Sequence, residues 1–398
     1  MSIFVAIVGL AFLILIHEAG HFFSALAVGM RPRKFYIGFP PPLVRVKRGG
    51  IEYGIGTIPL GGYVKIPGMH RPAARDLDYR LQHAITSAPA LVQPVEAVKR
   101  PLARADYGKA SVALDELELA LRAANQPTEV LTDVRDSLAP DAYWRQRAWK
   151  KVLVIFAGPG TNLLFAIVVF AILFMIGGGK ATSAVDDVLP DTPAARMGVQ
   201  AGDRILAIDG QPIREAADIP RFISHSDGKG VTLLVRRSGR AVTLGPTRPE
   251  KTNGVYRLGF VLRGQGLSAP AATKESVVLT ARVSRDIVGS LGSLVHKGGR
   301  DEISSPVGIV QGSSAAVDQG VKNYLWVLGL ISLSLALLNL LPLLPLDGGH
   351  IFFSLLEAVR GRAVAREVYE RVSAIGIALV LMLFFIGLTN DVGRIGGG

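Results

Sequence analysis

The sequence predicts a polytopic α-helical membrane protein with four spanning helices, a membrane-associated β-hairpin region and a compact α+β domain. Of the 398 residues, 49% are hydrophobic, and the mean hydropathy of +0.36 is above that of a typical soluble chain. Four apolar segments each approach the roughly 20 residues that a spanning helix needs. They cover residues 2–28, 151–176, 323–341 and 373–389.

Charge and cysteine content restrict the possible partners and metal ligands. The net charge is +12, but the basic residues are spread along the chain and several flank the apolar segments, which fits membrane topology. No nucleic-acid-binding motif accompanies them, so we expect a lipid bilayer and no nucleic acid as partner. Cysteine is absent, so any metal ion must be held by histidine and carboxylate side chains.

The first apolar segment contains His17-Glu18-Ala19-Gly20-His21, the pattern H-E-x-x-H. Charged or strongly polar groups in the middle of a spanning helix cost roughly 2.5–3.5 kcal/mol each, so they need a compensating partner. His17 and His21 project from one helix face and can share a Zn²⁺ ion, whereas Glu18 is rotated away toward a water molecule. Residues 1–70 are therefore predicted to combine this helix with the β-hairpin region.

The hairpin region and the segment after it differ in character. Residues 35–68 contain alternating and glycine-rich runs typical of strands and turns. We expect them to form a re-entrant hairpin near the first helix, because irregular backbone at membrane depth needs protein or water around it. Residues 71–144 are rich in alanine, leucine and charges. They are predicted to form a cytoplasmic helical insertion.

The second spanning helix lies within residues 145–180 and carries Asn162 early in its apolar stretch. Residues 182–264 are predicted to form the α+β domain. Thr192-Pro193 can start a short helix, and Asp209-Gly210 is a hairpin signal. Residues 265–322 form an amphipathic helix and a connector. Its apolar stripe, Val277, Ala281, Val288, Leu291 and Val295, suits either the membrane surface or packing against the domain.

Residues 323–398 contain the third and fourth spanning helices and the segment between them. Asp347 lies in an apolar stretch broken by two prolines and followed by two glycines, and an intramembrane carboxylate on a broken helix suggests a functional site. It is the candidate third metal ligand. Asn339 and Asn162 either hydrogen-bond between helices or hold a substrate backbone.

Clusters of basic residues set the predicted orientation. They occur at 31–34, 145–151 and 360–371, so the positive-inside rule places residues 31–150 and 342–372 in the cytoplasm. Residues 177–322 and both termini are then expected outside.

Together these motifs resemble the site-2 proteases, intramembrane zinc metalloproteases, and most closely their bacterial regulator-of-sigma-E type. The resemblance covers most of the chain and rests on five segments in this order: His17 to His21, Pro59 to Lys65, Ala157 to Asn162, Ser305 to Ile309, and Asn339 to His350. It implies a multi-pass protein of the bacterial inner membrane that cleaves spanning segments of single-span proteins.

The resemblance also implies roles for individual residues. His17, His21 and Asp347 would bind Zn²⁺, and Glu18 would be the catalytic base. Substrate would be aligned by Asn339, Asn162, Gly61, Gly62 and Tyr63. Residues 182–264 resemble a circularly permuted PDZ domain on the extracytoplasmic side, with a carboxylate loop formed by Arg257, Leu258, Gly259 and Phe260. One such domain fits here, whereas the better-known enteric member of the family carries two.

Implied partners are anti-sigma factors or signal-peptide remnants as substrates and an upstream first-site protease, with the active site opening toward the cytoplasm. Two alternatives stay open at this point. An inactive membrane scaffold could use the PDZ-like domain alone, and a metal transporter could use an intramembrane metal site. Chelator-sensitive cleavage of a single-span substrate would separate the three.

Overall fold

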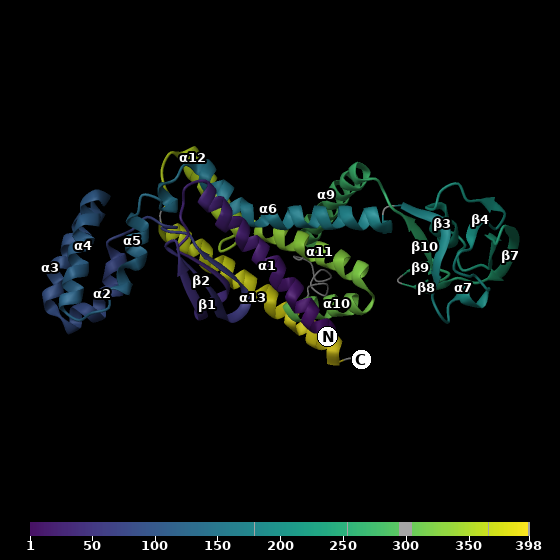
Figure 1. Cartoon of the computed structure of the whole chain (residues 1–398), viewed down its shortest axis with the longest axis horizontal. Coiled ribbons are helices and arrows are strands. Elements are labelled where there is room, and N and C mark those ends of the chain that lie inside the picture. The colour runs from purple at the N-terminus through teal and green to yellow at the C-terminus, as the bar shows by residue number, and fades with distance from the viewer. Residues whose placement is uncertain (179, 253, 294–304, 365, 397–398) are drawn as a thin grey trace. The chain divides into compact units, whose positions relative to one another are not determined.

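The computed structural model describes residues 1–178, 180–252, 254–293, 305–364 and 366–396. The chain divides into two compact units, Met1–Phe165 with Asp286–Gly398, and Ala166–Arg285. Within these described residues, four helices are long and apolar enough to cross a membrane, as predicted (Figure 1). They are Ser2–Ala27, Ala148–Gly178, Val321–Asn339 and Glu367–Gly393.

The first unit is mainly helical. Its helices include α1 (Ser2–Ala27), the first part of α6 (Ala148–Leu173), α10 (Pro306–Asp318), α11 (Val321–Asn339), α12 (Asp347–Arg360) and α13 (Arg366–Gly396). Small residues and hydroxyl groups allow close approach between helices. Gly9 leaves room for the ring of Tyr324, whose hydroxyl donates to the carbonyl of Val5 at 3.0 Å and so joins α11 to α1.

Strands β1 (Lys34–Arg48) and β2 (Ile51–Lys65) form a bent antiparallel sheet beside α1. The register of β1 shifts around its three prolines, where a regular ladder cannot be maintained. As a result, residues 34–37 pair with residues 52–55 on one side and with residues 62–65 on the other. Residues 62–65 therefore form an outer run of the sheet.

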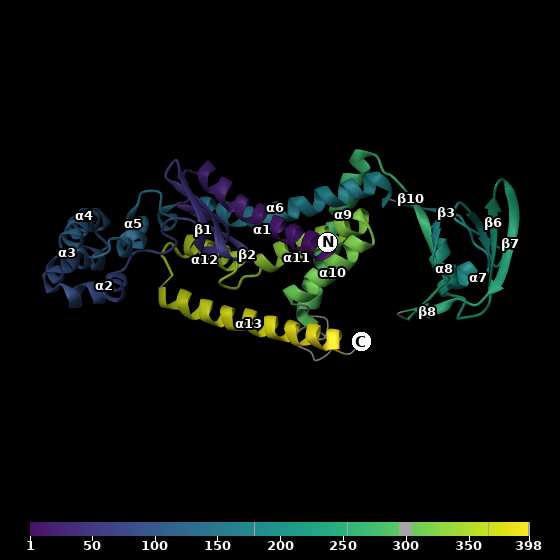
Figure 2. The same ribbon diagram turned by 60° about the horizontal axis from the view of Figure 1, so that its bottom comes forward.

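The predicted insertion is a small helical bundle (Figures 1 and 2). It contains α2 (Arg75–Ser87), η1 (Pro89–Leu91), α3 (Val92–Ala103), α4 (Tyr107–Ala123), η2 (Glu129–Leu131), α5 (Thr132–Leu138) and η3 (Tyr143–Arg145). Leu114, Leu117 and Leu121 recur at helical spacing and are buried, the pattern of an amphipathic helix. They share a core with Leu77, Leu81 and residues of α3 and α5.

The second unit contains the end of α6, a π-helical turn η4 (Phe174–Gly178) and the α+β domain. The elements of the domain are β3 (Lys180–Val188), α7 (Pro193–Arg196), β4 (Arg204–Ile208), β5 (Gln211–Pro212), α8 (Asp218–Ser224), β6 (Val231–Arg237), β7 (Arg240–Thr247), β8 (Glu250–Thr252), β9 (Val255–Arg257) and β10 (Phe260–Gln265). The main sheet has the order β10-β3-β4-β6-β7, with β5 paired to β4. Alternate residues Val231, Leu233 and Val235 are fully buried.

Two local predictions for this domain are confirmed. Thr192 caps α7 by accepting from the backbone N–H of Ala195, with Pro193 at the first helical position. Asp209 and Gly210, with φ of 48° and 77°, form the turn between β4 and β5, as expected for a type I′ hairpin.

Helix α9 (Ala269–Ser293) buries a different face from the apolar stripe that suited either the membrane surface or packing against the domain. Its buried positions include Ala272, Ser276 and Thr280, whereas Val277 and Val288 of the apolar stripe are 48% and 58% exposed. Small side chains pack closely, which explains why this face of the helix is the buried one. The side chain of Leu291 and residue Val295 lie outside the described part of the chain.

An ion pair buried in the α+β domain gives a stability prediction. The Asp203 side chain is 1% exposed, accepts from Arg237 at 2.8 and 2.7 Å, and accepts from the backbone N–H of Gln200. The hydrogen bond from Arg237 lowers the pKa of Asp203 below its usual value. The contribution of this carboxylate to the free energy of unfolding is therefore fully present above its pKa in the unfolded chain, pH ~4. It is lost as the pH falls through the lower pKa of the folded domain.

We expect Asp203→Ala to destabilise the domain by about 3–5 kcal/mol, because it leaves a partly buried guanidinium without its partner. Amide hydrogen exchange of residues 182–264 in the full-length protein in detergent measures this change. The exposed Asp187 provides the control, since Asp187→Ala should alter protection by at most about 0.5 kcal/mol. Equal protection in the two variants would contradict this account of Asp203.

Candidate metal centre and active site

The first helix and the start of α12 bring three possible metal ligands together. His17 Nε2 lies 3.1 Å from Asp347 Oδ2, His21 Nε2 lies 3.3 Å from the same oxygen, and the two Nε2 atoms are 3.3 Å apart. Both histidines are 7% exposed. Within the described residues this is the one group of three or more such side chains close enough to hold a metal ion.

The hydrogen bond of His21 defines which ring nitrogen faces the group. Its Nδ1 lies 2.8 Å from the carbonyl oxygen of Val154, an acceptor only, so Nδ1 carries the hydrogen and Nε2 presents a lone pair. Two imidazole lone pairs and a carboxylate oxygen at this separation repel one another unless a cation lies between them. The three distances also match the edge of about 3.3–3.4 Å expected for a zinc tetrahedron with bonds of 2.0–2.1 Å. The residues therefore fit Zn²⁺.

Glycine residues let α6 approach this group. A Cβ atom on Gly158 would lie 2.9 Å from His17 Nε2 and closer still to His21 Nε2, and one on Gly20 would collide with the backbone of Ala157. Thr161 Oγ1 reinforces the contact by donating to the carbonyl of Ile16 at 2.9 Å. The face of α6 that carries Gly158 thus forms one wall of the candidate centre.

Asp347 is positioned by the broken segment before it. Gly348 packs against the carbonyls of Leu340 and Leu341, and Gly349 against the backbone of Leu343 and Leu344. A side chain at either glycine would push this backbone away. The tight loop after α11 therefore places Asp347, the first residue of α12, next to the histidines of α1.

Glu18 faces the outer run of the sheet rather than joining the ligand group. A Cβ atom on Gly62 would overlap the side chain of Glu18, and the backbone N–H of Val64 lies near its carboxylate. The expectation that a hairpin within residues 35–68 lies near the first helix agrees with this contact. Gly61 has φ of 107° and packs on Phe39, while Tyr63 contacts the ring of Tyr36 with centroids 6.0 Å apart.

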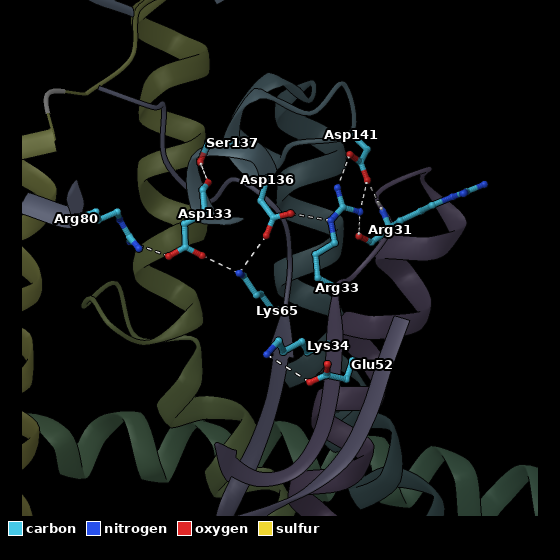
Figure 3. A network of polar contacts seen from close by, with 10 residues as sticks. All are labelled: Arg31, Arg33, Lys34, Glu52, Lys65, Arg80, Asp133, Asp136, Ser137 and Asp141. Carbon is cyan, nitrogen blue, oxygen red and sulfur yellow. Dashed lines mark hydrogen bonds and ion pairs between the residues drawn. The ribbon is translucent and has the colours of Figure 1, made fainter. Parts of the chain in front are cut away.

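A network of charged side chains ties the start of β1 and the end of β2, which pair with each other, to the helical insertion (Figure 3). Arg33, just before β1, donates to Asp136 at 2.9 Å and to Asp141 at 3.0 Å. Lys65, the last residue of β2, contacts Asp133 at 2.7 Å and Asp136 at 3.1 Å. The insertion therefore holds the strand that continues from Gly62 beside Glu18.

The electrostatics of this network favour its ionised form. Burial by itself would raise the pKa of Asp141 and of Asp133, but hydrogen bonds from Arg33 and Lys65, respectively, hold both values below the usual range. A carboxylate whose folded pKa is lowered stabilises the fold above pH ~4 and loses that effect as the pH falls further. The connection between insertion and sheet should therefore weaken in acid.

Asp136 offers a direct test, because its side chain is 10% exposed and bridges Arg33 and Lys65. We expect Asp136→Ala to destabilise the first unit by about 3–5 kcal/mol, since two cations lose a shared partner. Hydrogen exchange should show the largest loss of protection at residues 62–65. The control is Asp115→Ala, whose side chain is 73% exposed in its pair with Arg135, with an expected change of at most about 0.5 kcal/mol. Unchanged exchange at residues 62–65 would contradict the role of the network.

The two predicted asparagines have different surroundings. Asn162 is fully buried, four residues after Gly158 and so on the same helix face, and its amide atoms have no hydrogen-bond partner among the described residues. Asn339 is half-buried at the end of α11 and donates to the carbonyl of Leu335 at 3.0 Å. An unpaired buried amide is costly, so Asn162 has unused capacity for a ligand.

The predicted carboxylate loop lies in the α+β domain. Leu258 is buried in its core, and Gly259, with φ of 91°, accepts from the backbone N–H of Leu189 at 2.9 Å. Arg257 ends β9 and Phe260 begins β10.

Sequence reasoning included Gly158 in the matched segment Ala157 to Asn162 but assigned it no role, and it missed the carboxylates Asp133 and Asp136. A glycine inside a spanning helix, directly before Pro159, was an available signal because both residues weaken a helix and need a reason to be there. The carboxylates carried no such signal, since charged residues on a soluble helical bundle are ordinary.

Comparisons with known proteins find relatives over nearly the whole chain. The sequence model of Peptidase family M50 matches residues 5–383. The chain is 30% identical to a putative zinc metalloprotease of Rhizobium meliloti, over 96% of this chain and 94% of that protein. It is 28% identical to the zinc metalloprotease RasP of Geobacillus kaustophilus, over 98% and 97%. It is 26% identical to the probable protease eep of Enterococcus faecalis, over 99% of both.

Proposed function

Because this chain belongs to Peptidase family M50, the site-2 proteases, and is a zinc metalloprotease, we propose that His17, His21 and Asp347 bind its zinc ion and that Glu18 is the catalytic base. The observation that carries this assignment is the meeting of three lone-pair atoms 3.1–3.3 Å apart within an apolar helical unit. The membership itself favours an enzyme over the scaffold and transporter alternatives.

The chemistry of the bound ion is that of a Lewis acid, which makes a water molecule nucleophilic near neutral pH and polarises the scissile carbonyl. Glu18 would take the proton of the attacking water and return it to the leaving amine. His21 keeps its Nε2 lone pair directed at the centre through its bond to Val154. Helices α1, α6 and α12 exclude bulk solvent from the three ligands.

The outer run of the sheet is proposed to hold the substrate. A helical spanning segment hides its amides in internal hydrogen bonds, so it must unwind before cleavage. An extended peptide can then pair with the edge of residues 62–65, in the manner of β-strand addition. Gly62 would bring this edge against Glu18, and the buried amide of Asn162 would bind a freed peptide group, with Asn339, Gly61 and Tyr63 completing the substrate site.

Substrates are proposed to be single-span membrane proteins, such as anti-sigma factors or signal-peptide remnants, already cut by a first-site protease. The basic clusters near residues 31–34 and 145–151 support an active site that opens toward the cytoplasm of a bacterial cell. On this topology the α+β domain, 182–264, is an extracytoplasmic PDZ-like domain whose loop Arg257 to Phe260 faces a peptide end.

The function is tested with purified protein in detergent and a single-span model substrate. We expect cleavage within the spanning segment, its loss with the chelator 1,10-phenanthroline, and its recovery on adding Zn²⁺. Cleavage that persists in the chelator after exhaustive dialysis would overturn the metal-dependent mechanism.

Asp347→Asn tests the third ligand. A neutral amide binds zinc more weakly than a carboxylate, so bound zinc should fall from about one ion per chain to a small fraction of that. The matched control is Asp391→Asn, another buried carboxylate of the same unit, which accepts from the backbone N–H groups of Ser305 and Gly308. Retained zinc in Asp347→Asn would assign the third ligand elsewhere.

A further inference from the structure

A wide groove in the second unit is lined by arginines that form no ion pair with a carboxylate of the described residues. Its volume is about 900 Å³, and it lies over β3, β4, β6 and the end of β10. The charged residues of its lining are Arg204, Arg214, Arg236 and Glu215. None of the three guanidinium groups forms an ion pair with a carboxylate of the described residues, whereas the nearby Arg237 and Arg263 both do.

Two of these arginines face each other across the sheet. Arg204 of β4 is the direct cross-strand partner of Arg236 of β6, so their side chains leave the same face with Cβ atoms about 5 Å apart. Like charges in this position destabilise an antiparallel pair unless an anion lies between them. The arrangement therefore indicates a site for an anion with several acceptor oxygens.

The polar lining supplies further donors. Ser183 Oγ accepts from Arg204 Nε at 3.2 Å and keeps its own hydrogen for another acceptor. Gln265 also lines the groove, whereas the Thr182 hydroxyl already donates to the carbonyl of Arg263 at 2.8 Å. A planar guanidinium group can form two parallel hydrogen bonds to one phosphate, and nearby hydroxyl and amide groups can donate further ones. A carboxylate has fewer acceptor oxygens than a phosphate, so it would leave more of these donors without a partner.

The groove begins at the end of the membrane span. Gly264 packs against the backbone of Gly177, Gly266 packs against that of Met175, and the backbone N–H of Leu267 donates to the carbonyl of Phe174 at 2.9 Å. Gln265, between the two glycines, therefore lies level with the last turn of the span that ends at Gly178.

The other wall of the groove lies farther along β3. Ser183 is five residues after Gly178, at most about 17 Å away along an extended strand. Lipid phosphates lie in the layer of about 5–7 Å directly beyond the hydrocarbon core. Phospholipid headgroups are thus the phosphate source next to the near wall of the groove, at Gln265.

We propose that this groove, centred on Arg204 and Arg236, binds the phosphate of a membrane lipid headgroup. The site is separate from the candidate metal centre and independent of the proposed substrates. It would fix the membrane-proximal face of the α+β domain to the headgroup layer, where arginine contributes about 1 kcal/mol per side chain with anionic lipid.

The test uses the delipidated full-length protein in detergent, with phosphatidylglycerol, diacylglycerol of the same chains, inorganic phosphate and an acidic peptide as separate probes. Lipid retention is counted by native mass spectrometry. The variant is Arg204→Gln with Arg236→Gln, and the matched control is Arg263→Gln, an arginine of β10 paired with Asp186 at 3.1 Å. The double variant should bind phosphatidylglycerol about 30-fold more weakly than the wild type, and the control should lie within a factor of about two to three.

A second readout separates binding from damage to the fold. Without lipid, the thermal midpoint of the double variant should equal or exceed that of the wild type, because the like-charge pair is gone. With phosphatidylglycerol the wild type should gain in midpoint and the double variant should not. Equal retention of diacylglycerol, or phosphatidylglycerol affinity unchanged in the double variant, would overturn the proposal. Tighter binding of inorganic phosphate or of the acidic peptide than of phosphatidylglycerol would contradict the proposal that the ligand is a lipid headgroup.

Discussion

Glu18→Gln should lower the rate of peptide cleavage by a factor of about 10²–10⁴ while leaving the zinc content unchanged. The amide cannot take a proton from the attacking water, yet it keeps the size of the carboxylate and its contact with Gly62. Glu18 faces the sheet and the N–H of Val64, so its replacement removes no ligand from the metal. Single-turnover cleavage and zinc analysis of the same preparation measure both quantities.

Glu116→Gln is the matched control for this prediction, because Glu116 is exposed on the helical insertion. It should cleave at the wild-type rate. If Glu18→Gln retained full activity, the proton-transfer role would be wrong. If it lost zinc together with activity, Glu18 would instead be a ligand or a support for one.

Gly158→Ala should abolish both zinc binding and cleavage, although the substitution adds a single methyl group far in sequence from the ligands. The new Cβ would lie 2.9 Å from His17 Nε2 and nearer to His21 Nε2, so it would occupy the space where the ligand atoms converge. Either α6 or the two rings must move, and ligand geometry tolerates shifts of only about 0.2 Å. Zinc stoichiometry at fixed free metal, followed by activity, measures the effect.

Gly160→Ala provides the control on the same helix. Its added Cβ would meet the ring edge of Phe156 at 3.2 Å, and this side chain can shift slightly. Alanine also favours helix by about 1 kcal/mol over glycine, so the control variant should fold and bind zinc normally. Normal zinc content in Gly158→Ala would show that α6 does not form the wall of the centre.

Features with a local pattern were accessible from the sequence. Four long apolar runs predicted the four spanning helices, and Thr192-Pro193 and Asp209-Gly210 predicted a cap and a turn, because each depends on neighbours within a few residues. The spacing of His17 and His21 placed two rings on one face. Asp347 stood out because a carboxylate in a broken apolar segment has few structural uses.

Features that depend on distant pairing were not accessible. The shifted register of β1 around its prolines places residues 62–65 beside residues 34–37, and no alternation in the sequence specifies that order. The contacts of Lys65 with Asp133 and Asp136 join residues about 70 positions apart. Burial of Ala272, Ser276 and Thr280 in place of the valines of α9 depends on which helix approaches.

The central claim is that one zinc ion lies between α1 and α12, held by both. Anomalous diffraction from crystals of the full-length protein, collected on either side of the zinc absorption edge, tests this most directly. The account predicts one strong difference peak about 2.0–2.2 Å from His17 Nε2, His21 Nε2 and an oxygen of Asp347. A zinc-loaded, active preparation whose peak lies elsewhere, or contacts only one of these side chains, would contradict it.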